Sequence, residues 1–348
     1  MKLTRSAPVA GLALTVLALA GCGSDDGEGA GGDPAAADGT ITVVASTNVW
    51  GSIAERVGGD AVSVEALITD ASADPHAHPD KPSDAAKLAD ADVAVYNGGG
   101  YDEFFTKLVE TTGTDVPRVN AFELSAHAEE AGHEGEEEHA HEGEEHAHEG
   151  EEHAHEGEEH AEEEHGHGHE HGAVNEHVWY DLETVHKVAE RLAEEFGTLA
   201  PDHRETFTTN AEALGTELDD LATKAAGIGE ANPGAKVVAT EPVAKYLLDT
   251  AGLTDVTPPE FSEAIEEETD PPLAAVAATT ELISKNQVAA LVNNSQTETS
   301  VTNSLKDAAT KAGVPVVDVT ETLPEGVTDY VEWMTSAVDA LAGALDKS

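Results

Sequence analysis

The sequence has few positive charges, few aromatic residues and a single cysteine. Its 348 residues include 17 Lys and Arg against 70 Asp and Glu, a formal net charge of −53. Because nucleic acid phosphates and anionic lipid surfaces repel so acidic a chain, neither is an expected partner. Cys22 is the only cysteine, so no intramolecular disulfide can form. Aromatic residues are only 4% of the chain, but apolar residues make up 39%, which is enough for a folded core.

The sequence also lacks an apolar run long enough to span a bilayer. The run at residues 9–20 has 12 residues, whereas a spanning helix needs about 20. It ends in Leu19-Ala20-Gly21-Cys22, which resembles a bacterial lipobox. We therefore expect residues 1–22 to be a lipoprotein signal peptide and Cys22 to carry the lipid anchor on the extracytoplasmic side. A plain secretory signal is the alternative. Residues 23–39 are rich in Gly, Ala and Asp and predict a flexible tether.

One segment concentrates His and Glu. Residues 126–172 contain 19 Glu, 13 of the 18 His and no Lys or Arg, and His-Ala-His-Glu-Gly-Glu-Glu occurs three times between residues 139 and 159. Dense like charge and regular Gly predict a disordered loop over residues 127–171. We expect the loop to collect metal weakly, principally Zn²⁺, with Ni²⁺ or Cu²⁺ also suited. A solvated acidic linker is the alternative. The expected capture ligands are His139, His141, His146, His148, His153, His155 and, outside the loop, His78.

The rest of the chain alternates short β-rich runs with helical stretches, which indicates parallel α/β units. In residues 40–200 we expect strands at 41–45, 64–68 and 93–96 and helices at 52–58, 83–89 and 182–196. In residues 230–348 we expect strands at 237–239, 288–292 and 314–319 and helices at 243–250, 273–285, 300–312 and 329–345. The sequence therefore predicts two α/β lobes.

Residues 201–229 predict one long linking helix between these lobes. Its apolar residues recur every three or four positions, the spacing of one buried helix face: Phe207, Ala211, Leu214, Leu218, Leu221 and Ala225. Such a helix is roughly 40 Å long, which is more than either lobe needs. We expect it to connect the lobes and to end at Asn232-Pro233-Gly234.

Two histidines lie where α/β proteins bind ligands, beyond the carboxyl ends of strands. His76 follows the second expected strand in Asp74-Pro75-His76, and His177 opens the sequence His177-Val178-Trp179-Tyr180-Asp181. Each histidine alone could be a solvated loop residue or an ordinary core residue. Together they favour a metal site.

These motifs resemble those of the zinc/manganese solute-binding lipoproteins of metal ABC importers, the cluster A-I family. The resemblance covers residues 40 to about 344 and includes Asp74-Pro75-His76, Pro82-Ser83-Asp84, the run from Ala91 to Gly98, and the His177 motif. It implies two Rossmann-like α/β lobes joined by a rigid helix, with one metal ion in the cleft between them. It also implies a monomer that delivers the metal to an ABC permease.

The resemblance implies two further ligands from the second lobe. Glu241 occupies the position of the third ligand, where the zinc branch usually has His and the manganese branch has Glu. Glu321 stands where the fourth ligand is usually Asp. The alternative for Glu241 is a carboxylate that stabilises the start of a helix through the helix dipole. The alternative for Glu321 is a solvated turn residue. We expect Asn293, Asn294 and Gln296 to line the same cleft.

Two neutral imidazoles and two carboxylates carry a net charge of −2, which matches a divalent cation. Four N and O ligands suit Zn²⁺, while bidentate carboxylates could accommodate Mn²⁺. Glu241 favours manganese and the His-rich loop favours zinc. We predict Zn²⁺, with Mn²⁺ as the alternative, and tighter capture between about pH 5 and 8 as the histidines lose protons.

We expect a receptor rather than an enzyme. A catalytic metal needs an open coordination position and a base, and the sequence has no His-Glu-x-x-His motif. A hydrolytic metalloenzyme and a surface metal store or adhesin are the competing hypotheses.

Overall fold

The computed structural model describes residues 39–71, 73–79, 81–113, 115–128 and 174–346. The expected signal peptide with Cys22, the tether to residue 38 and most of the His/Glu loop, with its six expected capture ligands, lie outside the described residues. Within the described ranges, no helix is both long enough and apolar enough to cross a membrane.

The first lobe contains a parallel sheet of four strands, in the order β2-β1-β3-β4. The strands are β1 (Ile41–Thr47), β2 (Val62–Ile68), β3 (Val93–Tyr96) and β4 (Arg118–Asn120). The helices that connect or follow them are α1 (Asn48–Gly58), η1 (Gly59–Ala61), α2 (Pro82–Ala89), α3 (Glu103–Thr112) and α4 (Ala121–Leu124). The expected strands and helices of this lobe are confirmed, while α3, β4 and α4 were not predicted.

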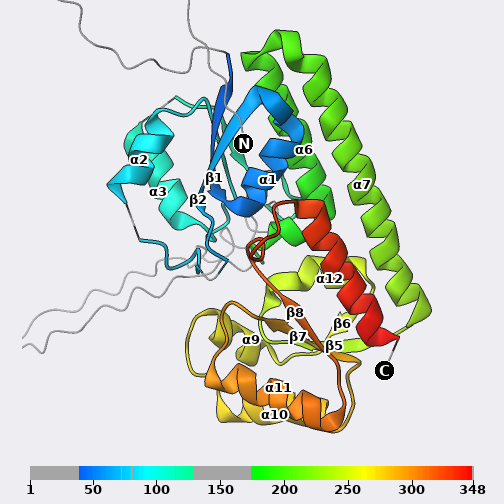
Figure 1. The fold of residues 1–348 in the computed structure, drawn as a ribbon. Coiled ribbons are helices and arrows are strands. Elements are labelled where there is room, and N and C mark those ends of the chain that lie inside the picture. The colour runs from blue at the N-terminus through cyan, green and yellow to red at the C-terminus, as the bar shows by residue number, and fades with distance from the viewer. Residues whose placement is uncertain (1–38, 72, 80, 114, 129–173, 347–348) are drawn as a thin grey trace, which may run out of the picture. The chain divides into compact units, whose positions relative to one another are not determined.

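The second lobe repeats this topology (Figure 1). Its parallel sheet has the order β6-β5-β7-β8, so in both sheets the first and third strands of the lobe are central. The strands are β5 (Lys236–Ala239), β6 (Thr254–Asp255), β7 (Ala290–Asn294) and β8 (Val316–Val319). The helices are η4 (Pro242–Ala244), α8 (Lys245–Thr250), α9 (Pro259–Glu266), α10 (Leu273–Ser284), α11 (Ser300–Ala312) and α12 (Tyr330–Leu345).

Two differences in the second lobe affect the site. The expected strand at 288–292 lies two residues later, as β7, so its last residue is Asn294. The helix α9, which begins at Pro258-Pro259, was not predicted. In the structure those prolines stand at the beginning of α9, where a missing N–H costs no helical hydrogen bond.

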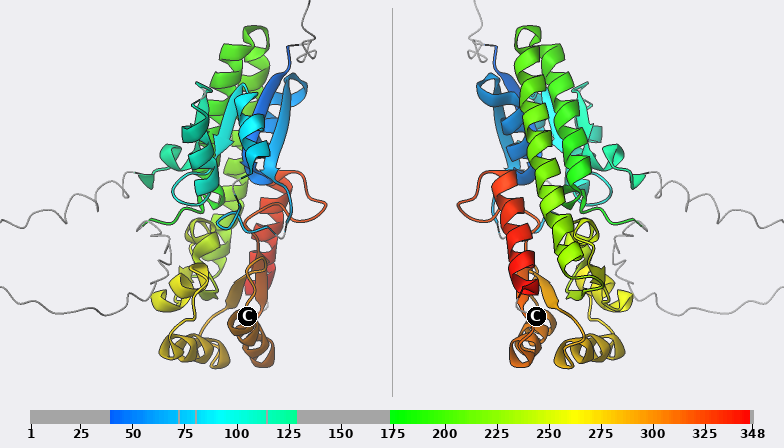
Figure 2. Two further views of the ribbon diagram at one scale, coloured as in Figure 1. Left: turned by 90° about the vertical axis from the view of Figure 1, so that its left-hand side faces the viewer. Right: turned by 90° about the vertical axis from the view of Figure 1, so that its right-hand side faces the viewer.

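The linking helix is α7 (Arg204–Ala231), whose 28 residues span about 42 Å. It follows η2 (Val178–Tyr180), α6 (Leu182–Leu199) and η3 (Pro201–His203). It packs against α1 and α6 of the first lobe and against α8 and α12 of the second (Figure 2). The predicted apolar stripe is its buried face. The expected long helix joining two α/β lobes is therefore confirmed.

One apolar core is shared by both lobes. It includes Val43 of β1, Leu214 of α7, Val292 of β7 and Met334 of α12, all buried. The opposite face of each sheet packs separately: Val44 contributes to a cluster with α2 and α3, and Val238 to a cluster with α9, α10 and α11. These alternating strand residues point to opposite faces, as expected for sheets covered on both sides.

Buried hydrogen bonds also link the lobes. The hydroxyl of Tyr180 donates to the carbonyl of Thr320 at 2.8 Å, and the hydroxyl of Tyr330 donates to the carbonyl of Trp179 at 2.6 Å. Trp179 and Tyr180 follow His177 in the chain, whereas Thr320 and Tyr330 belong to the second lobe. The two bonds therefore hold together the ends of the lobes that carry the candidate ligands.

Candidate metal site

The predicted site residues lie beyond the carboxyl ends of strands from both sheets. His76 is in the loop after β2, Glu241 follows β5, and Glu321 follows β8. His177 immediately precedes η2. Parallel strands in one sheet end at the same edge, so each lobe presents its polar side chains together.

The two histidines lie close to each other. Their ring centroids are 6.5 Å apart, and the Tyr101 ring lies 4.9 Å from His76 and 6.0 Å from His177. A ligand atom from each of His76, Glu176 and His177 lies within 4.8 Å of the other two. The expected pairing of His76 and His177 is thus present, together with a carboxylate that the sequence prediction did not include.

Asn175 orients the imidazole of His177. Its Oδ1 lies 3.1 Å from Nδ1 of His177 and accepts from the backbone N–H of His177 at 2.9 Å. The amide group of Asn175 donates to the carbonyl of Pro242 at 2.8 Å, and Tyr246 donates to its backbone carbonyl at 2.6 Å. Since Nδ1 faces Asn175 Oδ1, Nε2 is the nitrogen suited to bind a metal.

Glu241 and Glu321 form a buried pair, which we call the inner pair. Their exposed fractions are 5% and 4%. The side-chain amide of Asn294 donates to Glu241 Oε2 at 2.6 Å and to Glu321 Oε1 at 2.7 Å. Glu241 makes no side-chain capping bond to η4, and burial is inconsistent with a solvated turn for Glu321. Burial thus argues against the solvated-turn alternative for Glu321.

Neighbouring side chains hold this inner pair in place. Thr297 donates its hydroxyl to Glu241, and Gln296 accepts from the backbone N–H groups of Glu321 and Thr322. Asn294 and Gln296 therefore contact the inner pair, whereas the side-chain amide of Asn293 donates instead to Glu298 and Asp318.

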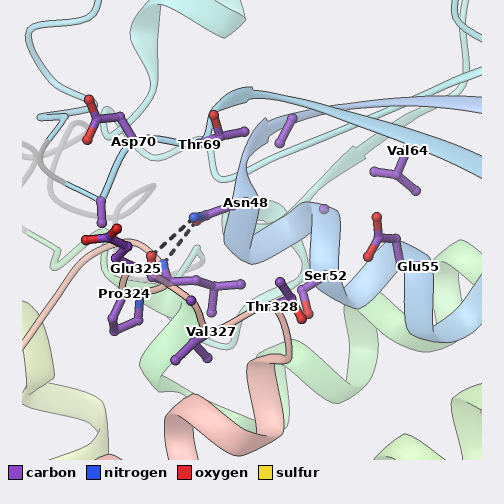
Figure 3. Close-up of a pocket in the computed structure, with 15 residues that line it drawn as sticks. Asn48, Ser52, Glu55, Val64, Thr69, Asp70, Pro324, Glu325, Val327 and Thr328 are labelled. Atoms are coloured by element: carbon purple, nitrogen blue, oxygen red, sulfur yellow. Dashed lines mark hydrogen bonds between the residues drawn. The ribbon is translucent and has the colours of Figure 1, made fainter.

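Asn48 fixes the loop that follows Glu321. Its amide donates to the carbonyl of Leu323 at 3.3 Å, and its Oδ1 accepts from the N–H of Leu323 at 3.0 Å. Figure 3 shows these two bonds in a pocket lined by Ser52, Asp70 and Glu325 among others. The bonds anchor the second-lobe loop to α1 of the first lobe.

Glu266 was also missed in the sequence, because α9 was not expected. Its Oε1 lies 3.7 Å from Nε2 of His177. This oxygen is buried and has no hydrogen-bond partner among the described residues. Around tetrahedral zinc with bonds of 2.0–2.1 Å, donor atoms are about 3.3 Å apart, so the spacing resembles that of two ligands of one ion.

Burial is the largest cause of a raised pKa at three carboxyl groups of the site. Burial raises the pKa of Glu241 to about 6, although the hydrogen bonds from Thr297 and Asn294 act to lower it. Burial, followed by the charge of Glu241, raises the pKa of Glu321 to about 8. Burial raises the pKa of Glu266 to about 9, and Glu176, Glu241 and Glu321 add to that rise. A bound cation would reverse these shifts by stabilising the ionised forms.

His78 and His127 lie in different surroundings. His78 Nε2 is 3.2 Å from Asp84 Oδ2, its ring centroid is 4.4 Å from that of Phe104, and its side chain is 7% exposed. His127 stacks on Tyr246 with centroids 4.2 Å apart and lies 3.5 Å from Asp181. Metal capture by His78 stays a prediction.

This chain is similar to lipoproteins named for either metal. It is 26% identical to the zinc-binding lipoprotein AdcA of Streptococcus pneumoniae, over 89% of this chain and 57% of that relative. It is 26% identical to the manganese-binding lipoprotein MntA of Halalkalibacterium halodurans, over 60% of this chain and 55% of that relative. The chain thus spans little more than half the length of these curated relatives.

The fold is similar to that of the periplasmic zinc binding protein TroA from Treponema pallidum. The two structures superpose with a TM-score of 0.66 at 16% identity, covering 88% of this chain and 99% of that chain. In addition, the family described as "ZnuA: Zinc-uptake complex component A periplasmic" matches residues 43–344. Because this match includes both lobes and the linking helix, the predicted resemblance is confirmed and the chain belongs to the ZnuA family.

Proposed function

We propose that this protein is an extracytoplasmic, lipid-anchored receptor that captures Zn²⁺ and delivers it to the permease of an ABC importer. The observation that carries the proposal is the pairing of His76 with His177 in one group of ligand atoms, to which the proposal adds the buried inner pair held by Asn294. Two neutral imidazoles and two carboxylates balance one divalent cation. The names of AdcA and of the ZnuA family agree with this assignment.

Zinc is favoured over manganese by the nitrogen donors and by the His-rich segment. Mn²⁺ stands lowest in the affinity order of divalent first-row metals, and it gains less than Zn²⁺ from imidazole. The oxygen donors of the inner pair and the similarity to MntA are the arguments for Mn²⁺. Manganese is therefore the alternative cargo.

A binding role suits the coordination better than catalysis does. The proposed protein ligands occupy the coordination positions of the ion, whereas hydrolysis needs an open position for water. Transport requires only capture and release, so the metal is the cargo of the protein rather than its cofactor. We infer that the protein is a monomeric binding protein and not an enzyme.

The test is a competition between Zn²⁺ and Mn²⁺ with residues 129–172 replaced by a short Gly-Ser linker. The replacement begins after Ala128 because His127 packs against Tyr246. We expect one tight site to remain, with Zn²⁺ bound in preference to Mn²⁺. A preference for Mn²⁺ would support the alternative cargo. Loss of nearly all bound metal would instead support a surface metal store.

A further inference from the structure

Two further carboxylates, Glu176 and Glu266, lie beside the histidines. We call them the outer pair. Glu176 shares a group of ligand atoms within 4.8 Å with His76 and His177. Glu266 faces the ligating nitrogen of His177 at 3.7 Å. The ligand set implied by the family resemblance contains neither residue.

The outer pair lies at a pocket of about 790 Å³. This pocket is lined by Glu176, Glu266, Glu263 and Glu267, with Asp249 and Asp255 among the other lining residues. His76, His177, Glu241 and Glu321 do not line it, whereas Glu176 and Glu266 line it and also neighbour the histidines. Clustered negative charge around a cavity raises the local concentration of cations, so a cation that enters this pocket meets the outer pair beside the histidines.

The main chain at Glu176 is fixed before any metal arrives. Its carbonyl accepts from the side-chain amide of Asn97 at 2.9 Å and from the N–H of Val178 at 2.7 Å. Glu176 itself is only 3% exposed. Because a fixed and buried backbone leaves the side chain little freedom to lose, binding through this carboxylate costs less entropy than binding through a mobile one.

Burial makes the carboxylate of Glu266 costly without a cation. The Glu266 side chain is 12% exposed, and its Oε1 lacks a hydrogen-bond partner among the described residues. A buried carboxylate is stable when it is protonated, paired with a positive charge or bound to a metal. The group that faces this oxygen is the imidazole of His177, at 3.7 Å, which the proposed function assigns to the metal.

We propose that Glu176 and Glu266 coordinate the metal from the pocket side, together with His76 and His177. This inference rests on the proposed function, since it uses the same histidines and the same cargo. In the loaded site the outer pair therefore binds the same ion as the two histidines.

The test compares Glu176→Gln and Glu266→Gln with Glu263→Gln in the intact chain. Glu263 lines the same pocket and is exposed, so its variant makes the same change in net charge outside the ligand cluster. Zn²⁺ affinity is measured against a chelator strong enough to leave only the tightest site loaded. Co²⁺ absorption at one equivalent reports the coordination geometry.

We expect each outer-pair variant to bind Zn²⁺ at least about tenfold more weakly and to change the Co²⁺ spectrum, with Glu263→Gln within about twofold of the unmodified chain. Wild-type affinity and spectrum in either outer-pair variant would overturn this inference and leave the proposed function standing. If the unmodified chain itself binds no Zn²⁺ tightly, the proposed function fails and this inference with it. If either Gln variant does not fold, the Asp variant at that position takes its place, and an unchanged Co²⁺ spectrum overturns the inference.

Discussion

Asn175 Oδ1 lies 3.1 Å from Nδ1 of His177, and the same oxygen accepts from the backbone N–H of His177. Asn175 is in turn bonded to Pro242 and Tyr246 of the second lobe. Asn175, which is not one of the proposed ligands, thus orients the imidazole of His177 and ties it to the segment that carries Glu241. The loss of such a supporting bond typically weakens metal binding 10- to 100-fold.

Asn175→Ala should therefore weaken Zn²⁺ binding by about 10- to 100-fold while the protein stays folded. The imidazole of His177 would lose the contact that orients its Nε2. Chelator competition measures the affinity, and circular dichroism checks the fold. Gln287→Ala, at an exposed amide between α10 and β7, serves as the control and should leave affinity unchanged. An unaltered affinity in Asn175→Ala would show that His177 is oriented by its packing alone.

His76→Ala and His177→Ala should each weaken binding by at least about 100-fold, more than the loss of a supporting hydrogen bond. Each variant removes a nitrogen ligand outright. His203→Ala is the matched control, because His203 is an exposed imidazole in η3. Isothermal titration in the presence of a chelator measures the change. Wild-type affinity in either variant would refute the assignment of that histidine.

Asn294→Ala should lower the free energy of unfolding of the metal-free protein by about 1–3 kcal/mol, the cost of leaving buried polar groups without their partner. Both carboxyl groups of the inner pair would lose a donor at once. Urea unfolding measures the change. Asn303→Ala, at an exposed asparagine of α11, should change stability little. Equal stabilities for the two variants would mean that the Asn294 bridge contributes nothing.

The stability of the metal-free protein should fall as pH rises from about 4.5 to 9. Burial raises the pKa of Glu241, Glu321 and Glu266 from 4.5 to about 6, 8 and 9. Over this range the folded protein holds protons that the unfolded chain has released, so deprotonation favours unfolding. Each group stops contributing above its own folded pKa.

Urea unfolding in the presence of a chelator, repeated across this pH range, measures that slope. Glu321→Gln removes one titrating group and should flatten the slope between about pH 4.5 and 8. Saturating Zn²⁺ should restore stability at the higher pH, because the ion binds the folded state. A slope that is unaffected by Glu321→Gln would show that other groups cause the pH dependence.

Glu241→His should raise the preference for Zn²⁺ over Mn²⁺. The substitution replaces an oxygen donor with a nitrogen donor, which suits zinc better than manganese. Competition between the two metals, measured on the unmodified protein and on the variant, tests this expectation. Glu241→Gln is the control for the loss of charge. A preference that does not change would place Glu241 outside the coordination shell.

Much of the fold could be predicted because it depends on local periodicity. The apolar stripe of α7 and the buried runs of β1, β3 and β5 are patterns of neighbouring residues, and the structure has them where they were expected. The short elements β4 and β6 have three and two residues. They are strands through pairing with distant segments, which no local pattern reveals.

The candidate site was predictable where a motif surrounds the residue. His76 and His177 lie in such motifs, whereas Glu266 is at the end of a helix that the sequence did not indicate. The position of Glu176 depends on Asn97, a partner 79 residues away. Glu176 immediately precedes His177, but the sequence does not distinguish a buried carboxylate beside a ligand from the many solvated ones in so acidic a chain. The Asn294 bridge likewise depends on three strands meeting at one edge.

The core shared along α7 limits how the protein can release its cargo. A wide swing of one lobe away from the other would expose apolar side chains from β1, β7 and α12 to water, at a cost of about 25 cal/mol for each Å². The helix α9 is attached differently, since Phe261 and Ile265 do not belong to the shared core. They pack with Val238, α10 and α11 in the separate cluster on the opposite face of the second sheet. Glu266 can therefore be withdrawn from His177 by a local shift of α9, with the shared core left intact.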